Sequence, residues 1–112
     1  MKNIHTDNTF TEHGFVSVVP YGEGFIVSWL DGRNTLPSSD GHGKGAMTLR
    51  SAEIDKEGKI INERLVDSMV CECCQTSMTI AGEIPLLVYR DRSREETRDI
   101  YVSRYINSQW SE

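Results

Sequence analysis

Short apolar runs with a period of two, separated by turn-forming residues, restrict the fold of this sequence more than any other feature. Residues 15–19 alternate, the turn Tyr21-Gly22-Glu23-Gly24 follows, and residues 25–30 are almost wholly apolar. Such a continuous apolar run is typical of a strand that is covered on both faces. Nowhere does the apolar pattern keep helical spacing for three turns. The sequence therefore predicts an all-β chain.

The strand pattern occurs twice, with an offset of about 60 residues. Strands are predicted at 15–19, 25–30, 46–54 and 60–66, and again at 77–81, 84–90 and 100–106, with a last strand starting near Trp110. Repeated four-stranded units are typical of propeller blades, although a seven-stranded sandwich has similar spacing. We expect one domain over residues 1–112, made of two consecutive four-stranded antiparallel propeller-type blades. The first covers residues 11–66, and the second, which is incomplete, covers 67–112.

Charge and hydropathy exclude several classes of partner. The net charge is −5, and acidic and basic residues are interleaved, whereas nucleic-acid binders carry a clustered basic stripe. The apolar share of 38% is too high for a disordered chain. No apolar run approaches the roughly 20 residues of a membrane helix, and no export leader opens the chain. We expect a soluble protein with neither a nucleic-acid nor a membrane partner.

Meander topology predicts that the unusual polar motifs share one end of the sheets. In a meander, the loop before strand one and the loop between strands two and three lie at the same end. Glu12 and His13 precede the first strand, and Cys73, Cys74 and Gln75 precede the fifth. Asp31, Arg33, Asp91, Arg92 and Arg98 fall in the loops between strands two and three of the two repeats. The turns at Glu23, Glu57 and Asn107 should lie at the opposite end.

Five segments resemble consecutive motifs of a bacterial sialidase-like β-propeller family of the BNR or Asp-box type. They read EHGFVSV, WLDGR, MTLRSAEID, VCECCQTS and VYRDRSREETRDI. The resemblance covers nearly the whole chain, but only about a third of a full-length propeller. It implies the propeller fold and a face that binds carbohydrate. The Asp-box pattern Ser-x-Asp-x-Gly-x-x-Trp is decayed at 51–58 and at 103–110, which argues against sialidase activity.

Arginines beside acidic residues form the candidate ligand site. A guanidinium binds a carboxylate through two parallel hydrogen bonds, and the family resemblance implies an arginine cluster that holds a sugar carboxylate. The alternative is that Arg–Asp pairs pin the loops to one another. The candidate ligand-binding residues are Glu12, His13, Asp31, Arg33, Arg90, Asp91, Arg92 and Arg98.

Catalytic residues cannot be chosen from the sequence. A glycosidase needs two spaced carboxyl groups, or a tyrosine nucleophile with an acidic partner in sialidases. Glu12, Asp31 and Asp91 are candidates for acid–base work and Tyr89 or Tyr101 for attack, but their spacing selects none of them. The leading hypothesis is a sialidase-like module that binds a carbohydrate or an acidic small ligand without turnover. A glycoside hydrolase (an exo-sialidase) that acts only in a full-length or assembled form is an alternative.

Self-assembly is the other alternative function. Two blades leave apolar lateral positions that neighbouring blades would cover, and the edge of the second repeat lacks a partner. We expect these positions to be Phe25, Val27, Trp29, Leu87 and Tyr89. The sequence therefore predicts a homo-oligomer, most simply a dimer, because two-fold pairing is the commonest closed form.

Three cysteines within four positions allow three interpretations. Cys71, Cys73 and Cys74, together with His13, offer ligands that suit zinc or copper. Alternatively, Cys73 and Cys74 form a vicinal disulfide, or Cys71 pairs with Cys74. The third interpretation is that all three are reduced and packed as small apolar groups. No other cofactor is expected.

Overall fold

The computed structural model describes residues 3–6, 13–35, 46–71, 74–93, 95 and 97–111. These residues form strands and connecting turns and contain no helix, which confirms the all-β prediction. The strands are β1 (His13–Tyr21), β2 (Gly24–Asp31), β3 (Thr48–Ile54), β4 (Ile60–Asp67), β5 (Ser77–Ala81), β6 (Ile84–Arg92), β7 (Arg98–Ile106) and β8 (Gln109–Trp110).

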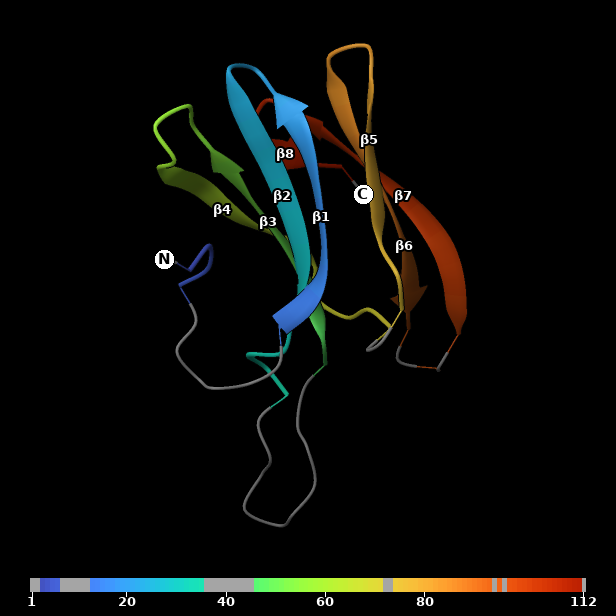
Figure 1. Ribbon diagram of the computed structural model, residues 1–112. Coiled ribbons are helices and arrows are strands. Elements are labelled where there is room, and N and C mark those ends of the chain that lie inside the picture. Colours follow the sequence, from blue (N-terminus) through green and yellow to red (C-terminus); the bar gives the residue numbers. More distant parts are fainter. Residues whose placement is uncertain are drawn as a thin grey trace.

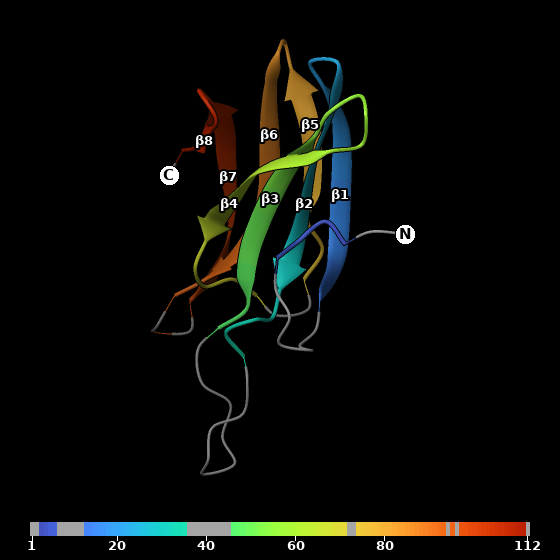
Figure 2. The same cartoon turned by 90° about the vertical axis from the view of Figure 1, so that its left-hand side faces the viewer.

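The strands form two four-stranded antiparallel sheets, ordered β1-β2-β3-β4 and β5-β6-β7-β8 (Figures 1 and 2). Every pairing joins strands that are consecutive in the chain, so each sheet is a meander, and no strand changes sheets. The second strands, β2 and β6, begin 60 residues apart, at Gly24 and Ile84, as the repeat in the sequence predicts, whereas the other equivalent strands begin 64, 50 and 49 residues apart. Neither sheet closes on itself, and the two sheets alone do not establish a propeller.

The main core lies between the two sheets. Side chains from β2 and β3 pack against side chains from β6 and β7, and the central members are Ile26, Leu30, Leu49, Leu87, Tyr89 and Tyr105. A second apolar cluster of Val27, Trp29 and Ala52 lies on the other face of the first sheet, with Ile4 packed against it. Strand β2 is therefore covered on both faces, as its continuous apolar run predicted.

This packing corrects the expected set of open lateral positions. Val27, Trp29, Leu87 and Tyr89 are buried, and only Phe25, at 49% exposure, is open. The error arose because the two repeats cover each other and Ile4 reaches back over the first sheet. The exposed apolar side chains of the second sheet include Val88, Ile100 and Val102, with 40%, 63% and 56% exposure.

Strands β1 and β5 lie side by side and join the two sheets. In β1, Gly14 pairs with Leu30 and Ser17 with Ser28, so two residues oppose one and form a β-bulge. Phe15, inside this bulge, has a φ of 52°. Its carbonyl oxygen accepts a hydrogen bond of 3.0 Å from the Thr76 hydroxyl, and the Ser17 hydroxyl accepts one of 3.0 Å from the backbone of Met78. The first strand of each sheet thus contacts the first strand of the other.

Strands β3, β7 and β8 also carry cross-sheet hydrogen bonds. Tyr105 donates its hydroxyl hydrogen to Glu53 at 2.6 Å, and the indole of Trp110 donates to the Ser51 hydroxyl at 2.6 Å. Burial and the Glu53 carboxylate both raise the pKa of Tyr105, so the phenol stays protonated and remains a donor. The sheets are therefore joined both near their first strands and through β3, β7 and β8.

Candidate functional site

The loop-bearing ends of the two sheets meet. The backbone N–H of Val70, which follows β4, donates a hydrogen bond of 3.0 Å to the carbonyl oxygen of Met47, which precedes β3. The next residue, Cys71, donates to the carbonyl of Arg90 in β6 at 3.0 Å. At the same end of the first sheet, His13 pairs with Asp31. The predicted turns at 22–23, 56–57 and 107–108 lie at the other end, as does the turn at 82–83 (Figure 1). The expected separation of motifs and turns is therefore confirmed for the described residues, whereas Glu12 and Cys73 lie outside them.

Asp31 is a buried carboxylate with an extensive set of donors. Its side chain is wholly shielded from solvent and accepts hydrogen bonds from the Trp29 indole at 2.8 Å, the Arg33 backbone at 3.0 Å and the Arg33 guanidinium at 2.9 Å. Burial alone would raise the pKa of Asp31, but the Arg33 and Trp29 hydrogen bonds outweigh it and hold this pKa well below its usual range. Asp31 is therefore ionised, and its carboxylate oxygens are bound by donors of the protein itself, from Trp29 and Arg33.

Arg33 extends this network to the outer strand β4. Its guanidinium contacts Glu63 at 3.2 Å, and Glu63 also accepts a hydrogen bond of 2.8 Å from the Thr6 hydroxyl. The hydrogen bond to Asp31 is the main reason that the pKa of Arg33 is raised. Asp31 and Arg33 thus follow the alternative interpretation from the sequence, in which an Arg–Asp pair pins a loop.

His13 lies against this network and stacks on a second histidine. Its Nε2 lies 3.5 Å from the Asp31 carboxylate, and its ring is nearly parallel to that of His5 at a centroid distance of 3.9 Å. Both rings line an apolar pocket of about 260 Å³ with Ile4 and Trp29. His5 was not predicted as part of the site, because it precedes the first strand and nothing in the strand pattern marks it.

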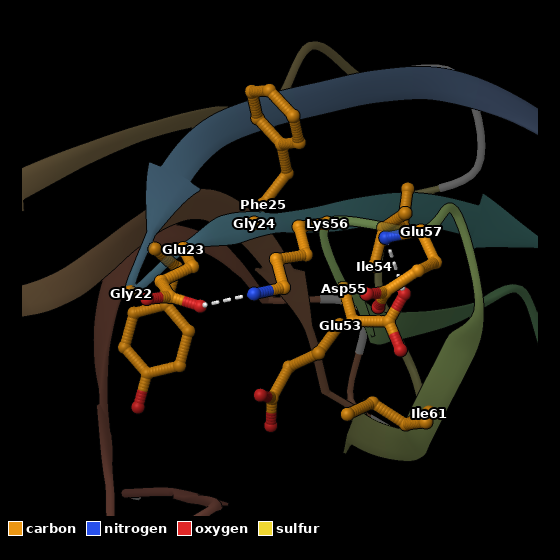
Figure 3. A pocket seen from close by; sticks show the side chains of 11 residues that line it. Gly22, Glu23, Gly24, Phe25, Glu53, Ile54, Asp55, Lys56, Glu57 and Ile61 are labelled. Carbon is orange, nitrogen blue, oxygen red and sulfur yellow. Dashed lines mark hydrogen bonds and ion pairs between the residues drawn. The ribbon is translucent and has the colours of Figure 1, made fainter.

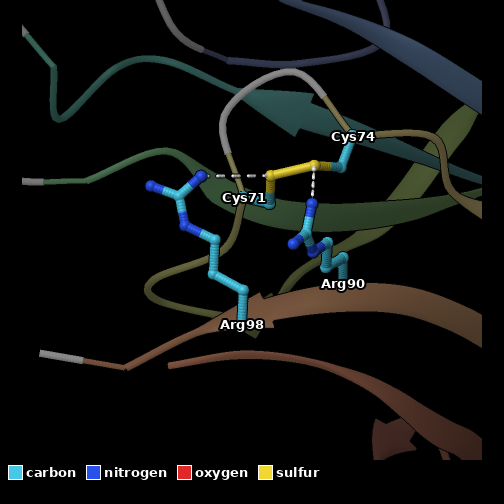
Figure 4. The surroundings of a disulfide bond; sticks show 4 residues. All are labelled: Cys71, Cys74, Arg90 and Arg98. Atoms are coloured by element: carbon cyan, nitrogen blue, oxygen red, sulfur yellow. Dashed lines mark hydrogen bonds between the residues drawn. A yellow bond between two sulfur atoms is a disulfide. The ribbon is translucent and has the colours of Figure 1, made fainter. Parts of the chain in front are cut away.

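Cys71 and Cys74 form a disulfide, which is one of the three interpretations of the cysteine cluster (Figure 4). Two arginines from neighbouring strands reach its two sulfur atoms. The Arg90 guanidinium, from β6, lies 3.8 Å from Cys74 Sγ, and the Arg98 guanidinium, from β7, lies 3.9 Å from Cys71 Sγ. Both arginines are exposed at this end of the second sheet. Arg92 pairs with Arg98 across the same two strands.

Asp67, Tyr89 and Asp91 form a further polar group between the sheets. The Tyr89 hydroxyl donates to Asp67 at 2.9 Å, and the Met69 backbone donates to the other Asp67 oxygen at 3.0 Å. Burial and the neighbouring Asp67 carboxylate raise the pKa of both Tyr89 and Asp91. A raised pKa suits Asp91 to proton donation. For Tyr89 a raised pKa is unfavourable, because a tyrosine nucleophile has to lose its proton. Catalytic roles for Tyr89, Tyr101 and Asp91 stay predictions.

Asp67 was missed at the sequence level. It ends the outer strand β4, and in the sequence it follows an ordinary apolar alternation without a motif of its own. Its importance comes from a tertiary contact: it accepts a hydrogen bond from Tyr89 of β6 and lines, together with Tyr101, a pocket of about 360 Å³.

The opposite end of the first sheet carries a pocket of about 320 Å³ with several acidic residues (Figure 3). The carboxylates of Asp55 and Glu23 are bound within the two turns that form it. Asp55 accepts hydrogen bonds from the backbone of Glu57 and Lys59 at 3.0 and 2.8 Å, while Lys56 pairs with Glu23 at 3.4 Å. This pocket therefore reflects two adjacent turns, and none of the predicted site residues lies in it.

The cysteine cluster bears directly on the predicted metal site. In the disulfide, Cys71 and Cys74 are not thiolates, and thiolates are the form that binds metal. Across the described residues, no group of three or more His, Cys, Asp or Glu side chains is arranged to hold a metal ion. Zinc or copper at Cys71, Cys73, Cys74 and His13 stays a prediction, since Cys73 lies outside the described residues.

Comparisons of the chain with protein-family profiles, with curated proteins and with solved structures returned no match. The part of the chain that the structure describes contains no helix long and apolar enough to cross a membrane.

Proposed function

We propose that this chain is a pair of sialidase-like propeller blades that binds an acidic small ligand, such as a carboxylated sugar, without turning it over. The ligand would lie at the loop-bearing end of the second sheet, against Arg90 and Arg98. The observation that carries the proposal is the convergence of these two exposed guanidinium groups on the two sulfur atoms of one disulfide.

Three features support the blade assignment. Each sheet is a four-stranded meander, the second strands of the two sheets begin 60 residues apart, and the first strands, β1 and β5, lie next to each other. In a propeller, the first strand of every blade lines the central axis, so adjacent blades meet through these strands. A Greek-key sandwich would instead exchange strands between its sheets.

The chemistry of the two arginines supports an anionic ligand. Sulfur is a weak hydrogen-bond acceptor, whereas a carboxylate accepts strong, charge-assisted bonds from guanidinium groups. Arg33 is held by Asp31 and Glu63. We therefore centre the proposed ligand site on the exposed Arg90 and Arg98, with Arg92 and Asp91 beside them.

Calorimetric titration with N-acetylneuraminic acid and with its uncharged methyl ester tests this proposal. We expect the acid to bind and the ester to bind at least tenfold more weakly, because a hydrogen bond to a charged group contributes about 1.5–3 kcal/mol. Arg90→Gln and Arg98→Gln should each weaken binding of the acid roughly tenfold or more. Arg104→Gln is the matched control, since Arg104 is exposed near the other end of β7. Equal affinity for acid and ester, or an equal loss with Arg104→Gln, would contradict the proposal.

Self-assembly is a second candidate function, which the open apolar face of the second sheet favours. Val88 and Val102 are cross-strand partners on β6 and β7, and both are exposed together with Ile100. Contiguous exposed apolar side chains are typical of protein interfaces. We expect a homodimer through this face, and sedimentation equilibrium over a dilution series should show twice the chain mass. Val102→Glu should yield monomers, while a wild-type protein that is monomeric at every concentration would rule out this function.

A further inference from the structure

The Cys71–Cys74 disulfide has two chemically different ends. Cys71 is 2% exposed, and its backbone is bound to Arg90 in β6, whereas Cys74 is only half-buried. The two cysteines are three positions apart, in a Cys-x-x-Cys arrangement. An incoming thiolate would therefore reach the sulfur of Cys74 and not that of Cys71, since exchange requires access to the attacked sulfur.

Each sulfur atom also has its own positively charged neighbour. Figure 4 shows Arg98 directed at Cys71 Sγ and Arg90 at Cys74 Sγ, at 3.9 and 3.8 Å. These contacts are weak while the sulfurs are joined, because neutral sulfur is a poor acceptor. They strengthen when the bond opens, since a thiolate beside a guanidinium is stabilised and its pKa is lowered. A lower leaving-group pKa speeds exchange, and stabilised thiolates favour the reduced state.

We propose that Cys71 and Cys74 form a reversible dithiol–disulfide pair, which a small dithiol reductant opens in the folded protein. This inference goes beyond the proposed ligand site and does not require a ligand. It assigns a reaction to the pair: Cys74 is the attacked sulfur, Cys71 is the leaving thiolate, and Arg98 and Arg90 are positioning residues that stabilise the two thiolates.

The exchange balances as a two-electron transfer. One thiolate of the reductant attacks Cys74 Sγ, the S–S bond breaks, and its electron pair leaves on Cys71 Sγ beside Arg98. The second thiolate of the reductant then attacks the reductant's own sulfur in the mixed disulfide and releases Cys74 as a thiolate beside Arg90. The reductant departs as a disulfide, and the two protons from its thiols pass to solvent. Oxidation of the pair by a small disulfide runs the same steps in reverse.

The first test uses the full chain with Cys73→Ser, so that a third thiol does not enter the count. The protein is incubated with dithiothreitol at pH 7 without denaturant, alkylated and weighed by mass spectrometry. We expect two cysteines to be alkylated, and the alkylated fraction to equal that obtained in urea. The circular dichroism spectrum should remain that of the folded protein. A disulfide that opens only in urea would overturn the proposal.

The second test measures the thiolates directly. Ultraviolet thiolate absorbance of the reduced protein over a pH series should give a thiol pKa at least about one unit below the ordinary value near 8.5. Arg98→Gln and Arg90→Gln should each raise a thiol pKa toward that value, and Arg104→Gln should leave both unchanged. Ordinary thiol pKa values in the wild type, or no response to either arginine, would refute the role given to the guanidinium groups.

The third test asks which sulfur reacts, and it requires no arginine variant. In the Cys73→Ser background, Cys71→Ser leaves only Cys74, and Cys74→Ser leaves only Cys71. We expect Cys74 to form a mixed disulfide with glutathione disulfide at least about tenfold faster than Cys71, because it is the more accessible sulfur. Faster reaction of Cys71 would overturn the assigned direction of attack.

Discussion

Replacing Asp31 with Asn is expected to lower the free energy of unfolding by about 3 kcal/mol, because the largely buried Arg33 guanidinium loses its main carboxylate partner and keeps only Glu63. Asp31 is fully buried and accepts hydrogen bonds from Trp29 and Arg33, which is itself only 17% exposed. For a domain whose total stability is about 5–15 kcal/mol, this loss is large. Urea denaturation measures it, and Glu83→Gln, an exposed turn carboxylate, is the control that should change stability by less than about 0.5 kcal/mol.

The loss caused by Asp31→Asn should also depend on pH in a defined direction. Because the pKa of Asp31 is depressed in the folded state, ionised Asp31 stabilises the fold at any pH above its unfolded value near 3.9. This contribution declines as the pH falls below that value toward the folded pKa. Wild type and variant should therefore differ most above about pH 5 and converge in acid. A difference that stays constant from pH 7 to pH 2 would show that the Asp31 charge is not responsible.

Replacing Leu87 with Ala is expected to destabilise the protein by about 3 kcal/mol, which is typical of large-to-small changes in a core. Leu87 is fully buried between the sheets, while Val88, the next residue of β6, is 40% exposed on the opposite face. Val88→Ala is therefore a matched control from the same strand, and it should cost less than about 1 kcal/mol. Thermal unfolding followed by circular dichroism would measure both.

The Leu87–Val88 comparison also tests which face of the second sheet packs against the first. If Val88→Ala were the more damaging of the two changes, the second sheet would have to pack through the other face of β6. In a protein that dimerises through Val88, the Val88→Ala effect should grow with protein concentration, so both variants are compared at the lowest concentration that gives a signal.

The strands were predictable because their pattern is local. Period-two alternation and turn residues placed β5 correctly and the other long strands within about two residues, and meander topology then followed from the short turns. The pattern does not predict which faces of the two sheets pack against each other. Positions such as Trp29 and Leu87 read as exposed lateral residues, because only tertiary packing decides what covers them.

The sequence predicted where the candidate site residues lie, but not which side chains bind one another. Topology alone grouped Asp31, Arg33, Arg90 and Arg98 at one end of the sheets. The sequence did not show that Arg33 is held by Asp31 and Glu63, because Glu63 is thirty residues away on the outer strand. It left three states open for the cysteines for a similar reason: pairing depends on how the backbone of Cys71 is placed against β6.

The strictly consecutive order of the strands has a consequence for how the chain folds. All sheet pairings close loops between neighbouring strands, so each meander forms from local contacts, whose closure costs little conformational entropy. The hydrogen bonds that join the sheets connect residues 22 to 61 positions apart, as in Tyr89–Asp67 and Thr76–Phe15. These non-local contacts carry the larger closure cost, so we expect them to form after the contacts within each meander. Substitutions at this interface should then change the unfolding rate more than the folding rate.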